Sequence, residues 1–246
     1  MVIPTPTIRR QSRDVVAHDF WQSRVCVQIE FVRLSYPSKK REFTRLVFEA
    51  AECRRCLTMC GRTAVLSNLN GPITARVMFI GEAPGRKGAD RTRVPFSGDQ
   101  SGKNLDRFIS SIDLTREQIF ITSAALCNPR TESGANRKPT QMEVGNCSDF
   151  LRRTVELINP AVIVTLGSVA LDAIKRIESH ELNLRNAAGK IHDWAGRLLV
   201  PIYHPSPQVL ASHRREREQL EDYQVVARAL ARVGFENPQH AHMRST

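Results

Sequence analysis

Residues 77–85 read VMFIGEAPG, and this stretch decides the fold. Its first four residues are apolar, which is typical of a strand buried on both faces in a parallel sheet. The next five residues combine glycine, alanine and proline with one acid, Glu82, and predict a turn. The stretch therefore predicts a buried parallel strand that ends in a turn with a polar side chain.

Three more apolar runs have the same character, and helical patterns lie between them. The runs cover residues 119–122, 162–166 and 198–203. Apolar residues recur at helical spacing in residues 42–51, 101–112, 140–158, 168–177 and 214–233. Alternating strands and helices predict an α/β fold, a three-layer α/β/α sandwich around a four-stranded, mainly parallel sheet.

The chain has 246 residues, of which 41% are apolar, so one sizeable domain with tails is expected. We assign residues 41–236 to this domain, residues 1–40 to a partly disordered extension and residues 237–246 to a disordered tail. No apolar run is long enough to cross a bilayer, and residues 1–10 lack the apolar core of a signal peptide. We expect a cytoplasmic monomer without a membrane partner.

The chain is strongly basic, with 36 Lys and Arg against 25 Asp and Glu and a net charge of +11. Such a charge favours a polyanionic partner such as nucleic acid. Taken by itself, the net charge is equally consistent with a basic surface that contacts only solvent.

Each predicted strand is followed by a segment with turn-forming or polar residues. These segments are residues 81–85, 123–127, 167–168 and 204–207. One such segment is an ordinary turn, but the carboxyl ends of parallel strands meet at one sheet edge, where open α/β folds bind ligands. We therefore expect the four segments to form one site.

The residue types in and near these segments suit hydrolysis of an N-glycosidic bond. A carboxylate can orient water and balance the positive charge that develops on the sugar, and the candidates are Glu82 and Asp99. The imidazole of His204 can donate to the departing base. Phe96 can stack on a base that has left the duplex; a lone Phe more often packs in a core, but the context Pro-Phe-Ser-Gly favours a pocket.

Six cysteines are present, and four of them form a candidate metal site. Cys53 and Cys56 make a Cys-x-x-Cys pair, Cys127 follows the second strand, and Cys147 lies in the next helix. By spacing alone, zinc and a [4Fe–4S] cluster fit equally well. Cys60 allows an alternative set of ligands, a local triad with Cys53 and Cys56. We interpret Cys26, the sixth cysteine, as a buried apolar residue.

Several motifs resemble the uracil-DNA glycosylase superfamily over about residues 42–231. Residues 81–85, GEAPG, resemble the first motif of family four, and residues 88–102, GADRTRVPFSGDQSG, resemble family five. Residues 136–139, NRKP, with Glu143 and Cys147 fit both families. Residues 204–207, HPSP, are similar to the second motif of the superfamily.

The resemblance implies roles for individual residues. Asp99 resembles the catalytic aspartate of family five, Glu82 stands where family four has a glutamate, and His204 stabilises the leaving base. The implied base pocket is Gly81, Ala83, Phe96 and Ser123. Cys53, Cys56, Cys127 and Cys147 match the ligands of a structural [4Fe–4S] cluster. The implied substrate is DNA, as a damaged duplex or a single strand.

One position departs from the pattern. These families usually carry Thr-Asn after the second strand, where the asparagine reads the edge of uracil, and this chain has Thr122 and Ser123. A serine hydroxyl cannot make the paired donor and acceptor contacts of an amide. We therefore expect weak selectivity for uracil and acceptance of other deaminated bases, or weak catalysis.

The segment after His204 also predicts DNA contacts. Gln208, Val209 and Leu210 are followed by a basic run, residues 213–215. An apolar tip beside basic residues suits insertion into the base stack with anchoring on phosphates. The candidates are Ser206, Leu210 and Arg214; in the alternative, Leu210 belongs to the core and the arginines are solvated.

The sequence thus predicts a DNA glycosylase that uses water as its nucleophile, because no lysine is expected beside the site. The alternative is a non-catalytic or weakly catalytic binder of damaged or single-stranded DNA, which the serine at position 123 motivates. The net charge of +11 argues against a third hypothesis, an iron–sulfur redox protein that does not act on DNA.

Overall fold

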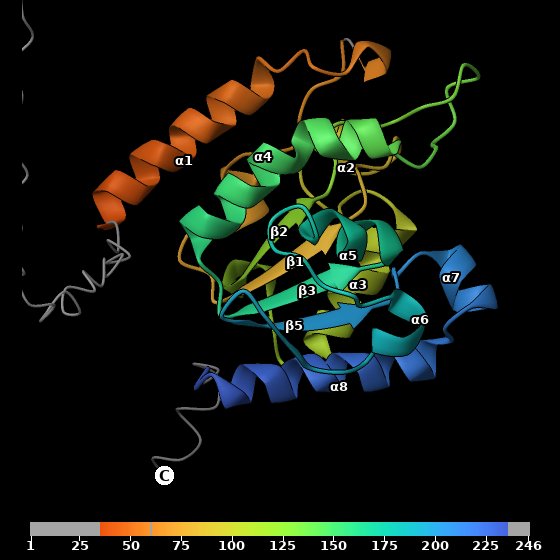
Figure 1. Ribbon diagram of the computed structural model, residues 1–246. Helices are drawn as coiled ribbons and strands as arrows, with labels where there is room; N and C mark the ends of the chain where they lie inside the picture. Colours follow the sequence, from red (N-terminus) through yellow and green to blue (C-terminus); the bar gives the residue numbers. More distant parts are fainter. Residues whose placement is uncertain (1–34, 60, 236–246) are drawn as a thin grey trace, which may run out of the picture. The chain divides into compact units, whose positions relative to one another are not determined.

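The computed structural model describes residues 35–59 and 61–235, which contain a five-stranded sheet in the order β2-β1-β3-β5-β4 (Figure 1). Four strands are parallel and β4 runs antiparallel to β5. The strands are β1 (Val77–Gly81), β2 (Ile119–Ser123), β3 (Val162–Leu166), β4 (His192–Trp194) and β5 (Arg197–Ile202). The predicted α/β fold with a mainly parallel sheet is confirmed.

The predicted count of four strands is wrong, because β4 was missed. This strand has three residues and turns back into β5 through Ala195 and Gly196, both with positive φ, 48° and 71°. Two such residues form the tight turn whose twist suits a hairpin. Three residues are too short to show a periodic apolar pattern, so no strand signal is visible in this part of the sequence.

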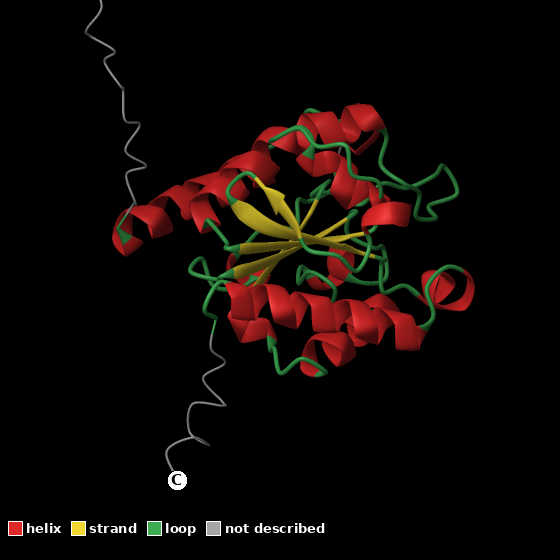
Figure 2. Ribbon diagram, turned by 60° about the horizontal axis from the view of Figure 1, so that its bottom comes forward, coloured by secondary structure: helices red, strands yellow, loops and turns green. Residues whose placement is uncertain are grey.

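Helices cover both faces of the sheet, as Figure 2 shows. On one face lie α1 (Tyr36–Ala51), α4 (Gln141–Ile158) and α5 (Ser168–Ile174), and on the other lie α3 (Gln100–Ser110) and α8 (Glu216–Arg232). Shorter elements are α2 (Ala89–Thr92), α6 (Leu184–Ala187), α7 (Pro207–Ser212), η1 (Leu57–Met59), η2 (Asn68–Asn70) and η3 (Arg116–Gln118). Within the described residues, none of these helices has the length and apolar character needed to span a membrane.

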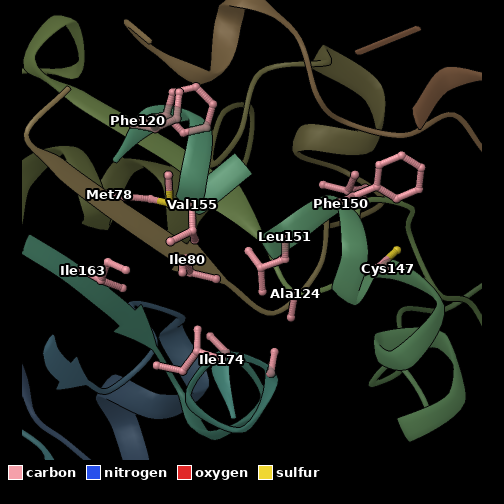
Figure 3. Packing of buried hydrophobic residues seen from close by; sticks show 14 of the residues in the cluster. Met78, Ile80, Phe120, Ala124, Cys147, Phe150, Leu151, Val155, Ile163 and Ile174 are labelled. Carbon is pink, nitrogen blue, oxygen red and sulfur yellow. The ribbon is translucent and has the colours of Figure 1, made fainter. Parts of the chain in front are cut away.

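The strand pleat divides the core into two clusters. Met78 and Ile80 of β1 point to the cluster under α1 and α4, whereas Val77 and Phe79 point to the cluster under α3 and α8. Figure 3 shows Met78 and Ile80 packed with Val155 of α4. Burying a side chain of this size contributes about 1.5–3 kcal/mol, so the apolar residues 77–80 stabilise both layers at once.

The outer edge of β2 is partly covered by η2. The buried amide of Asn70 donates to the carbonyl of Ile121 at 2.7 Å, and its Oδ1 accepts from the N–H of Ser67 at 2.8 Å. A backbone acceptor on this edge strand is therefore already paired. The opposite edge of the sheet is the three-residue strand β4.

Parts of the sequence predictions lie outside the described residues. These are most of the expected extension, the expected tail, Cys26 and Cys60. The assignment of residues 41–236 to one domain stays a prediction. The helix predicted over residues 214–233 corresponds to α8, which begins at Glu216.

Candidate active site

A cavity of about 490 Å³ lies at the carboxyl ends of β1, β2, β3 and β5. It brings together side chains from the loops that follow the four parallel strands, as the strand order requires. The predicted site residues that line it are Glu82, Ala83, Phe96, Asp99, Ser123, His204 and Ser206. The structure therefore places seven predicted residues around one space.

Asp99 is fixed at the start of α3. It is the N-cap of this helix, and its Oδ1 accepts the N–H of Gly102 at 3.0 Å. Its other oxygen lies against Gly88, where a Cβ atom would come within 2.2 Å of Oδ2. A side chain at position 88 would displace the carboxylate, so this close approach requires glycine.

Phe96 and His204 form an aromatic wall of the cavity. Their ring centroids are 5.5 Å apart and the rings are tilted by 36°. Gly81 does not line the cavity, but it allows the ring to lie over the end of β1, because a Cβ there would be 2.7 Å from Phe96 Cε2. A base that enters the cavity can stack on this wall.

His204 is held in its neutral form at neutral pH. Burial lowers the pKa of its imidazole to about 4, and the nearby carboxylate of Asp99 opposes this effect only in part. A neutral imidazole still donates one N–H. The ring can therefore donate to a base oxygen without carrying a charge of its own.

Glu82 and Lys138 face the same cavity. Burial raises the pKa of the Glu82 carboxyl group, and the positive charge of Lys138 opposes that shift. Lys138 is an exposed residue of the cavity lining. The expectation that no lysine lies beside the site is wrong, because the loop after β2 folds back to the cavity.

A polar network joins the loops after β1 and β2. The buried amide of Asn128 donates to the carbonyl of Pro84 at 2.6 Å and to Asn136 Oδ1 at 3.1 Å. Arg130 donates to Asn128 Oδ1 and pairs with the buried carboxylate of Asp90. Both N–H groups and the Oδ1 of Asn128 thus have partners within the protein, and these bonds hold the two loops together.

Ser123 is the last residue of β2, in register with Gly81 of β1, and its side chain faces the cavity. This is the place where the resemblance led us to expect an asparagine. The hydroxyl is the only polar group of the side chain at position 123.

The segment after His204, where the sequence predicts a wedge, makes contacts within the protein. Ser206 caps α7 by accepting the N–H of Val209 at 3.4 Å, and Leu210 packs against the core cluster under α8. The guanidinium of Arg214 is paired with Asp222, at 3.0 and 2.7 Å. Leu210 and Arg214 do not line the cavity, and their contact with DNA stays a prediction.

The cavity also has lining residues that the sequence did not assign to the cavity itself. Besides Lys138, these include Asn136 of the NRKP motif, Tyr203 next to His204, and Gln208, Val209 and His213 of the segment around α7. The motif positions of Asn136 and Lys138 were a signal that could have found them. Leu184 of α6 also lines the cavity, and nothing in its sequence context indicates this.

The four predicted ligand cysteines are free thiols drawn from three segments. Cys147 lies on α4 and belongs to the core cluster shown in Figure 3. Burial raises the pKa of Cys127 to about 12 and that of Cys147 to about 11, and the charges of Cys53 and Cys56 act on both. The four sulfurs therefore lie within electrostatic reach of one another. Within residues 35–59 and 61–235, however, no group of three or more Cys, His, Asp or Glu side chains is in position to hold a metal ion.

Comparison with known proteins places the chain in a family. The family model described as the uracil DNA glycosylase superfamily matches residues 70–228. The chain is 35% identical to the type-4 uracil-DNA glycosylase of Archaeoglobus fulgidus over 176 residues, which are 70% of this chain and 85% of the relative. It is 33% identical to the type-5 uracil-DNA glycosylase of Pyrobaculum aerophilum over 180 residues, 67% of this chain and 75% of the relative. With one family model matched over most of the fold and relatives of both types, the chain belongs to the uracil DNA glycosylase superfamily.

Proposed function

We propose that this chain is a monofunctional DNA glycosylase that hydrolyses the N-glycosidic bond of uracil or another deaminated base. The observation that carries the proposal is the convergence of Asp99, His204, Glu82 and Phe96 on one cavity. The relatives named type-4 and type-5 uracil-DNA glycosylases support it.

Each of these four residues has a different role in the proposed reaction. Phe96 stacks on the extruded base, and the neutral imidazole of His204 donates a hydrogen bond to the base oxygen as negative charge develops there. Asp99 orients the attacking water and stabilises the positive charge on the sugar. Glu82, whose pKa is raised by burial, is the second carboxyl group available for the proton that the water releases.

We also propose that Cys53, Cys56, Cys127 and Cys147 hold a [4Fe–4S] cluster. The chemistry of the donor set supports the cluster, because thiolates are its usual protein ligands and the charges of Cys53 and Cys56 act on both Cys127 and Cys147. In the described structure no three of these side chains surround a metal position, so the proposal requires the thiols to close around the cluster when it binds. When bound, the cluster supplies a structural cross-link between the three segments. Protein purified without oxygen should be brown and contain about four irons, whereas colourless protein with stoichiometric zinc would contradict the proposal.

We propose DNA as the substrate, a monomer as the acting form and the cytoplasm as its location. The net charge of +11 supports the polyanionic substrate. Contacts from Ser206, Leu210 and Arg214 to DNA belong to this proposal, although the pairing of Arg214 with Asp222 leaves less of its charge for a phosphate.

A panel of oligonucleotides tests the activity. Uracil, hypoxanthine and xanthine are placed in single strands, in matched duplexes and in mismatched duplexes, and abasic sites are measured under single-turnover conditions. We expect abasic sites without strand cleavage, and no covalent complex after borohydride reduction. A trapped complex that disappears in Lys138→Ala would instead show that this lysine is a nucleophile and that the enzyme is not monofunctional.

The second candidate is a weakly catalytic or non-catalytic binder of damaged or single-stranded DNA. Ser123, which faces the cavity where the resemblance has an asparagine, favours it. Tight binding to the modified strands without any abasic product in the panel would establish the binder and overturn the glycosylase.

A further inference from the structure

Two buried amide side chains hold the backbone of the loop that carries His204. Gln219 Nε2 donates to the carbonyl of His204 at 3.2 Å, and Asn104 Nδ2 donates to the carbonyl of Pro205 at 2.8 Å. Gln219 is 1% exposed and Asn104 is 5% exposed. Because water has little access, a carbonyl that loses its donor here stays unpaired or moves.

Asn104 belongs to the helix that Asp99 caps. Gln100 Nε2 donates to Asn104 Oδ1 at 3.0 Å, which leaves the NH₂ group of Asn104 to face Pro205. The orientation of the amide is therefore fixed at both ends. Within α3 the backbone is rigid, so one helix sets the positions of the Asp99 carboxylate and of the Pro205 carbonyl together.

The loop itself adds little freedom of its own. Pro205 is buried and its ring fixes the backbone angle φ, and the next residue, Ser206, is the N-cap of α7. Gln219 holds the carbonyl of His204 and Asn104 holds the carbonyl of Pro205, so two consecutive peptide groups of the backbone that carries the imidazole are held. Neither amide lines the cavity, so neither contacts a substrate.

We infer that Asn104 is a positioning residue of the proposed glycosylase reaction, on which this inference rests: through the Pro205 carbonyl it fixes the imidazole of His204 relative to the carboxylate of Asp99. Gln219 holds the same loop from α8. A displacement of about 1 Å in a reacting group lowers a rate about 100-fold. The effect of losing either amide should therefore appear in the chemical step and not in the binding of DNA.

Asn104→Ala tests the inference, with Asn70→Ala as its matched control. Asn70 is also a buried amide that donates to a backbone carbonyl, but it does so at the outer edge of β2. Both variants should lose thermal stability. Only Asn104→Ala should lower the single-turnover excision rate, by about 10- to 100-fold, while DNA affinity changes less than about twofold. Gln219→Met, which keeps the side-chain volume and removes the donor, should show the same pattern if Asn104→Ala folds poorly.

A second measurement does not depend on activity. The pKa of the His204 imidazole, followed by NMR, should rise from about 4 towards its ordinary 6.5 in Asn104→Ala, because the loosened loop admits water to the ring, and should stay unchanged in Asn70→Ala. An unchanged His204 pKa together with wild-type excision in Asn104→Ala would overturn the inference. A wild type without any excision would defeat the proposed function instead, and the NMR titration would then still decide whether Asn104 positions the ring.

Discussion

Asp99 has two tasks, because it caps α3 and also presents a carboxylate to the cavity. Asp99→Asn separates them, since asparagine caps a helix as well as aspartate does but carries no charge. We expect the melting temperature to stay close to that of the wild type and single-turnover excision to fall about 100-fold or more. The measurement is excision on uracil DNA beside a thermal melt.

Asp99→Ala serves as the comparison. It removes the charge and the cap together, and the lost cap costs about 1 kcal/mol, so the melt of this variant should shift downwards. If Asp99→Asn excised uracil as fast as the wild type, the carboxylate of Glu82 would have to carry the role proposed for Asp99.

The partly buried imidazole of His204 links stability to pH. Its pKa is lowered to about 4 in the folded chain, from an ordinary 6.5, so the unfolded chain binds more protons between these values. The contribution to stability is fully present above about pH 6.5 and is lost as the pH falls towards 4. Urea unfolding at pH 7 and pH 5 should show a larger loss for the wild type than for His204→Gln; equal losses would mean that the ring is solvated.

We expect Ser123 to determine how strictly the cavity selects its base. Its hydroxyl makes fewer directed contacts than an amide, so a wrong base leaves fewer buried groups unpaired. We expect excision of hypoxanthine and xanthine beside uracil, fastest where the base is unpaired. Ser123→Asn should raise uracil excision relative to the other bases. A wild type already strict for uracil, and unimproved by the substitution, would show that another residue reads the base.

Among the secondary-structure elements, the pattern of apolar residues predicted the strands and helices that are long and regular. The strands β1, β2 and β3 lie where continuous apolar runs placed them, because burial on both faces leaves a clear signal in the sequence. β4 left no such signal in the sequence, because it is only three residues long. The ends of the four parallel strands then located Asp99, His204 and Phe96 around one cavity, since the strand order alone brings these loops together.

Side-chain partners could not be predicted from the pattern. The sequence predicts Leu210 and Arg214 as DNA contacts, and this stays a prediction; it gives no sign that the partly buried Leu210 packs against the core cluster under α8 or that Arg214 pairs with Asp222, eight residues later on α8. Lys138 reaches the cavity only because its loop folds back after β2. Such contacts depend on the path of a loop, and loops lack the periodic apolar pattern by which helices and strands are recognised in a sequence.

The end of α1, the loop after β2 and the middle of α4 each bring cysteines to one region. If these cysteines hold the proposed cluster, substituting one of them should affect all three segments, since binding of a metal site is coupled to folding. Cys53→Ser should lose the iron and the brown colour and lower the melting temperature. Cys60→Ser is the control and should keep the iron; if it loses the iron while Cys147→Ser keeps it, the ligand set is wrong.

For the whole molecule, the net charge of +11 predicts how binding responds to salt. If the basic surface meets about four to six phosphates, the logarithm of the binding constant should fall against the logarithm of salt concentration with a slope near −4 to −5 on duplex DNA. Fluorescence anisotropy across a series of salt concentrations measures the slope. Affinity that stays flat across the series would contradict a nucleic-acid substrate.

The two edges of the sheet have a consequence for how the molecule behaves in a crowded solution. An exposed edge strand is a template on which another chain can add a strand and start an aggregate. Here one edge is the three-residue β4, which is too short to pair with a long strand of another chain. At the other edge, the Asn70 amide already donates a hydrogen bond to the Ile121 carbonyl. Both ends of the sheet are poor templates, so the described part of the chain resists growth into fibrils.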